Sequence, residues 1–312
     1  MYIWTNLQKV RTKNTTTLFE EEQPLKYTFS GHDTFQCRQL WLKKGYDFLV
    51  KDKKSFNDDD AVILLGVGKN MVSSIRYWLK AFNIVDSKDI PTRFGHALFS
   101  DNGWDPFLED EASVWLLHYQ IVKTNLASIY NIIFNEFRKE KFTFEKESFC
   151  NYMKRRKETE ANLFMNENTI ADDFTVFTKM YSKNTSNTKE IEDFFQGILS
   201  EIELLKRLTN GKDEQYQIIS NERDTLPAAI MLFSILENTT YGNSISLNSL
   251  EYETNSPGSI FALNRNGLVN KILELVKDYP KNFTYTDHAG IKELQLKTKP
   301  EPYTILNKYY GK

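Results

Sequence analysis

The sequence lacks the features that mark several common classes of protein. It has only two cysteines in 312 residues, Cys37 and Cys150, and their wide separation indicates neither a disulfide framework nor a zinc site. The net charge is −2, from 40 basic and 42 acidic residues, so nucleic-acid binding would require a local basic patch. No apolar run approaches the length of a membrane span, and the first residues are polar. We therefore expect a cytoplasmic protein without membrane contact.

What remains is the composition of an ordinary globular protein. Hydrophobic residues make up 40% and charged residues 26% of a chain that is long enough for two domains. We predict a mainly α fold with small β-wings, of the α+β class. The predicted divisions are a flexible N-terminal arm at 1–26, a winged helix-turn-helix domain at 27–122 and a mainly helical C-terminal domain at 123–312.

The stretch from 60 to 99 carries the clearest pattern. A short apolar helix at 61–65 breaks at two glycines, and the longer helix that follows has apolar residues at every third or fourth position. Its opposite face is polar and basic, which is typical of a helix-turn-helix, and residues 84–93 fit a wing. We predict that this unit binds duplex DNA. The predicted DNA-binding residues are Lys69, Asn70, Ser73, Arg76, Tyr77 and Lys80 on the helix, and Lys88 and Arg93 on the wing.

This stretch has two other possible interpretations, a helix pair without DNA contact and a phosphate-binding loop. A helix pair with an amphipathic second member occurs in any α-rich protein and needs no DNA. The fragment GVGKN lacks the phosphate-loop pattern, because one residue separates its glycines and Asn70 stands where a hydroxyl is required. Basic residues exceed acidic ones by five to two over 69–93 and by eight to three over 138–157, although a solvated helix face explains the second run equally well.

Two polar clusters are candidates for chemistry. A histidine and an aspartate beside an arginine could supply acid–base catalysis, but a capped helix that ends at Gly45 explains them more simply. Three carboxylates before residue 111 could bind a metal ion, and they also lie at a turn and at a helix start. The candidate catalytic residues are His32, Asp33 and Arg38, and the candidate metal ligands are Asp105, Glu109 and Asp110.

The C-terminal half reads as helices with short strands. The period predicts helices at 114–121, 129–138, 169–181, 191–208, 226–236 and 265–276, the last of them capped by Asn264. Residues 245–247 alternate like a strand, and 283–286 with 291–296 fit a hairpin. This combination would suit a second winged-helix-like unit. His118, on a helix that is apolar nearly all round, is interpreted as a core histidine.

Several phrases also resemble a known bacterial family. They are FSGHDTF, WLKKGY, FNDDDAVILLGVGKNMVSSIRYW, PTRFGHALF and GWDPFLEDEASVWLLH. The family is a domain of unknown function, DUF4007, which includes SspB-like proteins of DNA phosphorothioation gene clusters. The similarity extends from about residue 27 to 296, with its strongest motifs before residue 119.

The resemblance implies a role in a DNA phosphorothioation and anti-phage defence system. It implies a DNA-binding component and, as an enzyme, a DNA nickase that would use Mg²⁺ or Mn²⁺. The implied partners are double-stranded DNA and a cysteine desulfurase, an ATPase and a PAPS-reductase-like enzyme. The alternative function is a non-catalytic protein–protein assembly adaptor of the same modification complex. No catalytic constellation is carried over from the family to residues of this chain.

Overall fold

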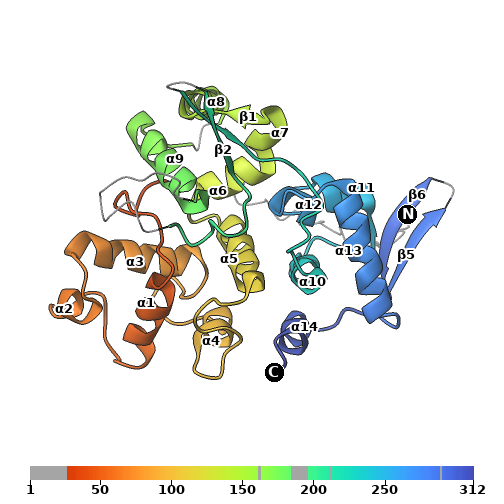
Figure 1. The fold of residues 1–312 in the computed structure, drawn as a ribbon, viewed down its shortest axis with the longest axis horizontal. Helices are drawn as coiled ribbons and strands as arrows, with labels where there is room; N and C mark the ends of the chain where they lie inside the picture. Colours follow the sequence, from red (N-terminus) through yellow and green to blue (C-terminus); the bar gives the residue numbers. More distant parts are fainter. Residues whose placement is uncertain (1–26, 161–162, 184–195, 211–212, 289) are drawn as a thin grey trace, which may run out of the picture.

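The computed structural model describes residues 27–160, 163–183, 196–210, 213–288 and 290–312, so the predicted arm at 1–26 lies outside the described residues. Helices dominate, and two three-stranded antiparallel sheets accompany them, which confirms the α+β class. Three groups of elements follow one another along the molecule, and α5, the last helix of the first group, lies beside the other two groups (Figure 1). The first group is α1 (Trp41–Val50), α2 (Ala61–Leu65), α3 (Lys69–Ala81), α4 (Arg93–Phe99) and α5 (Glu111–Thr124).

The short helix predicted at 61–65 and the longer helix predicted after the two glycines are confirmed as α2 and α3. Gly66 ends α2 with a left-handed φ of 57°, a conformation that suits glycine because it has no Cβ. Helix α3 buries Val72, Ile75 and Leu79 against the core, as the spacing predicts. Its polar residues are thereby turned outward.

The predicted wing is reduced to a tight loop. Its backbone forms one isolated antiparallel bridge, between Val85 and Pro91, in place of two strands. The side chain of Asp86 closes the loop, because its Oδ1 accepts hydrogen bonds from the amides of Lys88 (2.8 Å) and Ile90 (2.9 Å). The short helix predicted after the wing is confirmed as α4.

The helix predicted to begin at Asp33 or Thr34 and to end at Gly45 is wrong at both ends. Helix α1 begins at Trp41 and continues through Gly45 to Val50. Asp33 and Thr34 have positive φ angles of 46° and 66°, which no helix start accommodates. A Cβ on Gly45 would lie 2.7 Å from Cδ1 of Leu79, so this glycine allows α1 to pack closely on α3.

The second group surrounds a mixed helix and the first sheet. Helix α6 continues through a π-helical turn into α7, which confirms the helix predicted at 129–138. The sheet has the order β1-β3-β2. The elements are α6 (Ser128–Ile132), η1 (Ile133–Phe137), α7 (Arg138–Glu140), β1 (Thr143–Phe144), α8 (Lys146–Thr159), α9 (Glu167–Tyr181), β2 (Lys206–Asn210) and β3 (Asp213–Gln217).

The long helix predicted at 191–208 is wrong over the part that the structure describes. Residues 196–205 form a loop, and β2 follows it and pairs with β3. The loop is fixed by its backbone: Ile198 donates to the carbonyl of Cys37 (3.0 Å), and Gly197 lies so close to Met180 that a Cβ would approach its Cα to 2.4 Å. Burial of Ile198 and Ile202 thus explains the helix-like spacing without a helix.

The third group carries the second sheet, whose strand order is β4-β6-β5. The predicted hairpin and the helix capped by Asn264 are confirmed, since the Asn264 side chain accepts a bond from the amide of Gly267. No helix of the described ranges is long and apolar enough to cross a membrane. The elements are α10 (Ala228–Leu236), β4 (Ser244–Ser246), α11 (Leu247–Tyr252), α12 (Pro257–Ile260), α13 (Arg265–Asp278), β5 (Phe283–His288), β6 (Ile291–Leu296) and α14 (Pro302–Tyr309).

Candidate nucleic-acid interface

The first turns of α3 present polar side chains to solvent. Lys69, Asn70 and Ser73 are exposed, while Val72 and Ile75 beside them are buried. Gly68 precedes the helix with an extended backbone and offers no side-chain cap, and the first amides of an α-helix have no acceptor within the helix. These groups can donate to phosphate oxygens or to base edges.

The second half of this face is occupied by an ion cluster that we call the Asp89 clamp: Arg76, Lys80, Asn57 and Asp89. Nε of Arg76 lies 3.1 and 3.0 Å from the two carboxylate oxygens of Asp89, and Nη2 lies 2.6 Å from Oδ2. Nζ of Lys80 lies 3.0 Å from Oδ1. Nη1 of Arg76 donates to Oδ1 of Asn57 (3.1 Å). Arg76 and Lys80 are partly exposed and share one carboxylate as their counter-ion.

The electrostatics of the clamp follow from this geometry. Burial alone would raise the pKa of Asp89, but hydrogen bonds from Arg76 and Lys80 more than offset it and hold that pKa below its ordinary value. The same bonds with Asp89 raise the pKa of Arg76. Asp89 is thus an anion at neutral pH, and the clamp carries a net charge of about +1.

Tyr77 does not belong to the exposed face, although it was predicted to contact DNA. Its hydroxyl is buried, and its ring packs edge-on against His32 and Trp78 at 5.9 and 5.1 Å between centroids. The ring also leaves no room for a Cβ on Gly31. Burial raises the pKa of Tyr77 far above its usual value. Tyr77 directly follows Arg76 in the sequence, and for this reason it was assigned to the polar face of the helix.

The two cations predicted on the wing differ in their surroundings. Lys88 is exposed at the tip of the loop. Arg93 is exposed as well, but it pairs with Glu301 (2.7 Å), and its guanidinium lies 3.7 Å from the ring centroid of Tyr303. Arg93 therefore ties α4 to the C-terminal segment.

His32 and Asp33 are not brought together as a catalytic pair. His32 is buried, and its Nε2 lies 2.9 Å from Oδ1 of Asp173, a residue of α9. Its Nδ1 accepts a bond from the amide of Thr34 (3.2 Å), so the proton is on Nε2, which donates to Asp173. Both ring nitrogens are engaged within the core, whereas the Asp33 side chain is exposed. No local pattern in the sequence indicates Asp173, which is 141 residues from His32.

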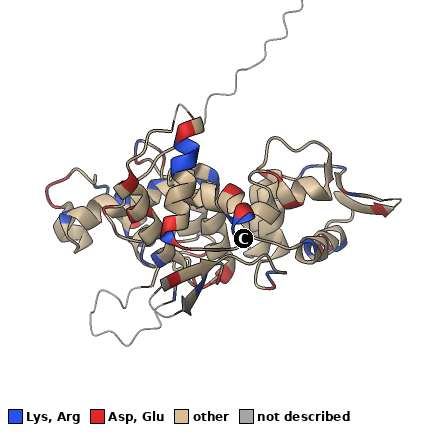
Figure 2. Cartoon of the chain, turned by 90° about the horizontal axis from the view of Figure 1, so that it is seen from above, with Lys and Arg blue, Asp and Glu red and all other residues tan. Residues whose placement is uncertain are grey.

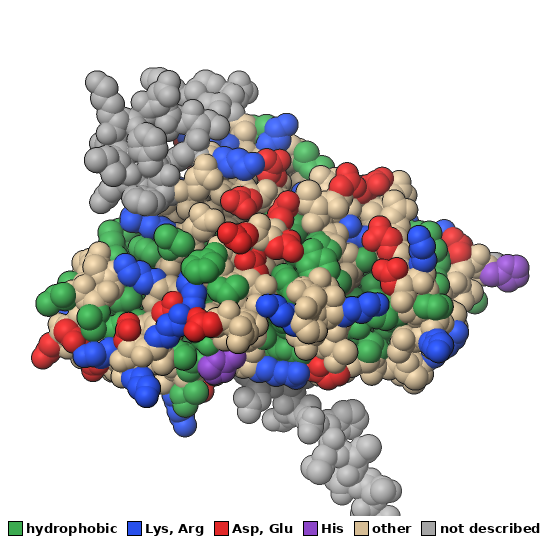
Figure 3. Space-filling view, turned by 60° about the horizontal axis from the view of Figure 1, so that its bottom comes forward, with side chains coloured by type: hydrophobic (Ala, Val, Ile, Leu, Met, Phe, Trp, Pro, Cys, Tyr) green, Lys and Arg blue, Asp and Glu red, His purple; other side chains and the backbone are tan. Residues whose placement is uncertain are grey.

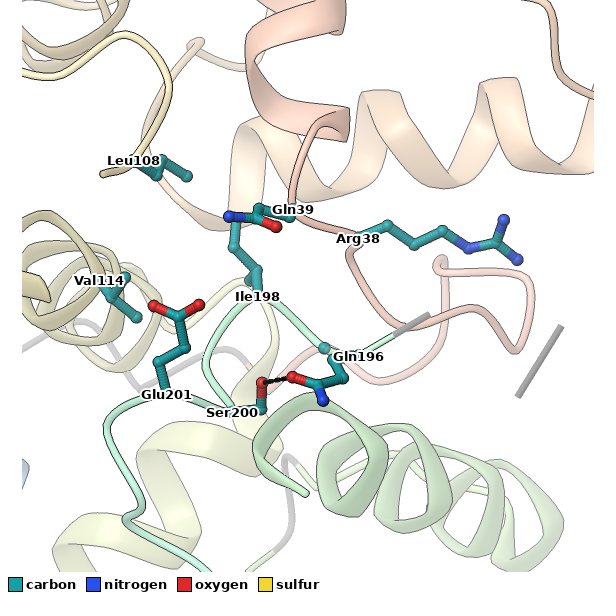
Figure 4. A pocket seen from close by; sticks show the side chains of 9 residues that line it. Arg38, Gln39, Leu108, Val114, Gln196, Ile198, Ser200 and Glu201 are labelled. Carbon is teal, nitrogen blue, oxygen red and sulfur yellow. Dashed lines mark hydrogen bonds between the residues drawn. The ribbon is translucent and has the colours of Figure 1, made fainter. Parts of the chain in front are cut away.

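Arg38, the third candidate, lines a small cavity of about 240 Å³ between the start of α1 and the loop at 196–201. Figure 4 shows its side chain pointing away from Glu201, and its Cζ lies 5.2 Å from the ring centroid of Trp41. Across the cavity, the Ser200 hydroxyl donates to Oε1 of Gln196 (3.3 Å). His32 is not among the residues that line this cavity, so the cavity does not bring Arg38 and His32 together.

A wider hollow of about 670 Å³ adjoins the small cavity at Glu201. Trp115 and Ile202 contribute apolar surface to it, and most of its other side chains are acidic. Figure 3 shows acidic side chains gathered near the middle of the face turned forward. A surface of this sign repels a duplex. The acidic lining residues are Glu111, Glu201, Glu203, Glu222 and Asp224.

Of the three residues predicted to bind a metal ion, Asp105 and Asp110 accept hydrogen bonds from the backbone instead, and Glu109 is exposed. Asp105 is buried, and its two oxygens accept bonds from the amides of Glu109 and Asp110, both at 2.9 Å. Asp110 caps α5 by accepting from the amide of Ala112 (2.9 Å). Within the described residues, no group of three or more histidine, cysteine or acidic side chains could hold a metal ion. These residues therefore do not fit a Mg²⁺ or Mn²⁺ site.

Comparison with known proteins places this architecture beside two solved structures. One is a crystal structure of magnesium-ion-bound SspB and the other a crystal structure of SspB, each 26% identical, covering 91% of this chain and 88% of that chain. Their TM-scores are 0.80 and 0.79. No curated protein matches the chain significantly. The family model for "Protein of unknown function (DUF4007)" matches residues 29–310, and the chain therefore belongs to that family, as its motifs indicate.

Proposed function

We propose that this protein is a DNA-binding component of a DNA phosphorothioation and anti-phage defence system. The observation that carries the proposal is the outward-facing polar surface of α3, with Lys69, Asn70 and Ser73 exposed above a buried apolar stripe. The similarity to the SspB structures supports a role in a phosphorothioation system. The exposed hydrogen-bond donors of α3 support DNA as the ligand. Double-stranded DNA would lie along α3 and the tip of the loop at Lys88.

The test is a salt series of duplex binding, measured by fluorescence anisotropy. Phosphate contacts make the logarithm of affinity fall linearly with the logarithm of salt concentration, by about 0.9 for each neutralised phosphate. Lys69→Ala should lower the affinity at every salt concentration and flatten the slope by roughly one unit. Lys179→Ala removes an exposed lysine of α9 and serves as the matched control. Equal slopes for wild type and Lys69→Ala would remove α3 from the interface.

We further propose that the third group of elements is a winged-helix-like module. Its elements follow the order α10, β4, α11, α12, α13, β5, β6, and its sheet has the order β4-β6-β5, so β5 and β6 would be the wing and α13 the recognition helix. Asn266 and Asn270 are exposed on α13. A duplex long enough for both modules should bind more tightly than one that covers a single module, by an avidity effect.

A second candidate function, a protein–protein adaptor, is favoured by the surface of α2. Val62, Ile63 and Leu64 are consecutive apolar residues with exposed fractions of 38%, 79% and 46%, directly before the turn into α3. Ile63→Asp should then abolish capture of the cysteine desulfurase, ATPase or PAPS-reductase-like partner and leave duplex binding intact. Loss of duplex binding in the same variant would assign this surface to DNA.

Strand nicking is proposed only at the level of the family resemblance. Because Asp105, Glu109 and Asp110 do not fit a metal site, no cleavage step is assigned to them. Supercoiled plasmid incubated with the protein and Mg²⁺ or Mn²⁺ tests the activity directly. Relaxed plasmid would establish a nickase, and intact plasmid with every metal ion would leave a binding protein.

A further inference from the structure

The Asp89 clamp has the chemistry of a phosphate-binding site that is already filled. A guanidinium that faces an anion with Nε and Nη2, joined by a lysine ammonium, is the arrangement that proteins use for carboxylates and phosphates alike. Here Arg76 and Lys80 approach the same carboxylate, with N–O distances between 2.6 and 3.1 Å. Both cations lie on the face of α3 that Lys69 and Ser73 continue toward solvent.

The loop holds Asp89 in this position by a conformation of its own. Asp89 has a φ of 63°, in the left-handed region, which aspartate adopts less readily than glycine. The amides on either side, of Lys88 and Ile90, are both held by Asp86. The Asp89 side chain is 16% exposed, so water reaches the carboxylate, and Lys88 next to it is exposed. The carboxylate is therefore accessible to exchange with another anion.

We propose that Asp89 occupies the place of one backbone phosphate and that a bound duplex displaces it from Arg76 and Lys80. This inference rests on the proposed DNA binding of α3 and adds its regulation. The loop at 86–90 is an autoinhibitory contact: it lowers the affinity for any polyanion until other contacts, at Lys69 and Lys88, hold the duplex in place. The carboxylate and the phosphate compete for the same two cations.

The test is a double-mutant cycle on duplex binding with the full-length protein. Asp89→Asn removes the competing charge, keeps the shape of the side chain and suits a left-handed φ, so the affinity should rise about tenfold at fixed salt. In an Arg76→Ala/Lys80→Ala background, Asp89→Asn should change the affinity less than twofold. Asp59→Asn, an exposed acid next to α2, should also change it less than twofold. Thermal unfolding of each variant confirms that it is folded.

The outcomes separate the inference from the proposed function. Wild type that binds DNA with an affinity unchanged by Asp89→Asn overturns the clamp and leaves DNA binding standing. A gain that persists without Arg76 and Lys80, or that Asp59→Asn reproduces, assigns the effect to general charge and also overturns it. If neither wild type nor Asp89→Asn binds duplex at low salt, DNA binding by α3 itself is refuted.

Discussion

At the scale of single residues, the hydrogen bonds of His118 in the core fix which of its ring nitrogens carries the proton. His118 is fully buried: its Nε2 donates to the carbonyl of Ile260 (2.8 Å), and its Nδ1 accepts from the hydroxyl of Tyr181 (2.7 Å). Burial above all, helped by the nearby positive charges of Arg223 and Arg138, lowers the pKa of His118 to about 3, against the opposing effect of the bond to Ile260. The core histidine that the sequence indicates is thus neutral in the folded protein.

Acid should destabilise the protein through His118. Its pKa is about 3 when folded against 6.5 for the free side chain, so between these pH values only the unfolded chain binds the proton. The free energy of unfolding should fall by about 1.4 kcal/mol for each pH unit below 6.5 on this account. Urea unfolding at pH 7, 6 and 5 measures it. His118→Gln should be less stable at pH 7 yet lose less on acidification, and the exposed His288→Gln should match wild type.

A second residue-scale prediction concerns Asp105. Asp105→Ala would leave the partly buried amides of Glu109 and Asp110 without their acceptors, which should cost about 2–4 kcal/mol of unfolding free energy. Glu109→Gln, at an exposed neighbour, should cost less than about 0.5 kcal/mol. Equal loss in the two variants, measured by thermal unfolding, would contradict the backbone role assigned to Asp105.

The same examples show what sequence can deliver at this scale. Local bonds were predictable: Asn264 caps α13 because its side chain reaches an amide three residues on. The partners of His32 and of Arg76 were not, since Asp173 comes from a distant helix and Asp89 from the far end of a loop. Asp89 does lie in the wing predicted at 84–93, shortly after Lys80 in the sequence. An acidic residue in that wing was the available signal for a partner of Arg76.

Elements with a complete pattern were predicted well. Helix α3 has both an apolar stripe and a glycine boundary, and its ends agree with the structure to within a residue or two. The stretch 191–208 has the stripe but lacks an end signal, and its described part follows the backbone bonds of Ile198 and the β2–β3 pairing instead. Spacing reports burial, and only the boundaries and the long-range partners distinguish a helix from a buried loop.

The contact between α4 and the start of the loop offers a prediction at the scale of elements. A Cβ on Gly95 would lie 2.2 Å from the carbonyl oxygen of Ile84, so Gly95→Ala must move backbone. We expect a loss of about 1–3 kcal/mol in unfolding free energy, with the loop that carries Asp89 displaced. Gly242→Ala, which would have its closest neighbour at 4.0 Å, is the matched control and should be nearly neutral.

At the scale of the whole molecule, the C-terminal helix returns to the first group of elements. Nε1 of Trp104 donates to Oδ1 of Asn307 (2.8 Å), and the ring of Trp104 stacks on Tyr310 with 5.5 Å between centroids. The hydroxyls of Ser113 and Tyr310 lie 2.9 Å apart. Figure 2, seen from above, shows basic and acidic positions interspersed along the ribbon rather than separated into a basic and an acidic half.

Removal of residues 301–312 should therefore destabilise more than the C-terminal half. Helix α14 covers Trp104, so its loss should shift tryptophan fluorescence to longer wavelength and lower the melting temperature of the whole chain. A melting temperature like that of wild type would contradict this coupling and would agree with the predicted division into domains at 27–122 and 123–312. That division, at 122 and 123, falls within α5, which is buried over most of its length.

The Asp89 clamp on α3 also affects which anions this protein would bind. A competitor built into the chain has an effective concentration set by the loop geometry, and dilution of the sample does not change it. A free nucleotide or an inorganic phosphate ion has no second contact to hold it, so on the proposed exchange it would not displace the Asp89 carboxylate from Arg76 and Lys80. A duplex anchored through neighbouring phosphates acquires a comparable local concentration, so on the proposed exchange the protein would discriminate by the length of the polymer rather than by the charge of any one group.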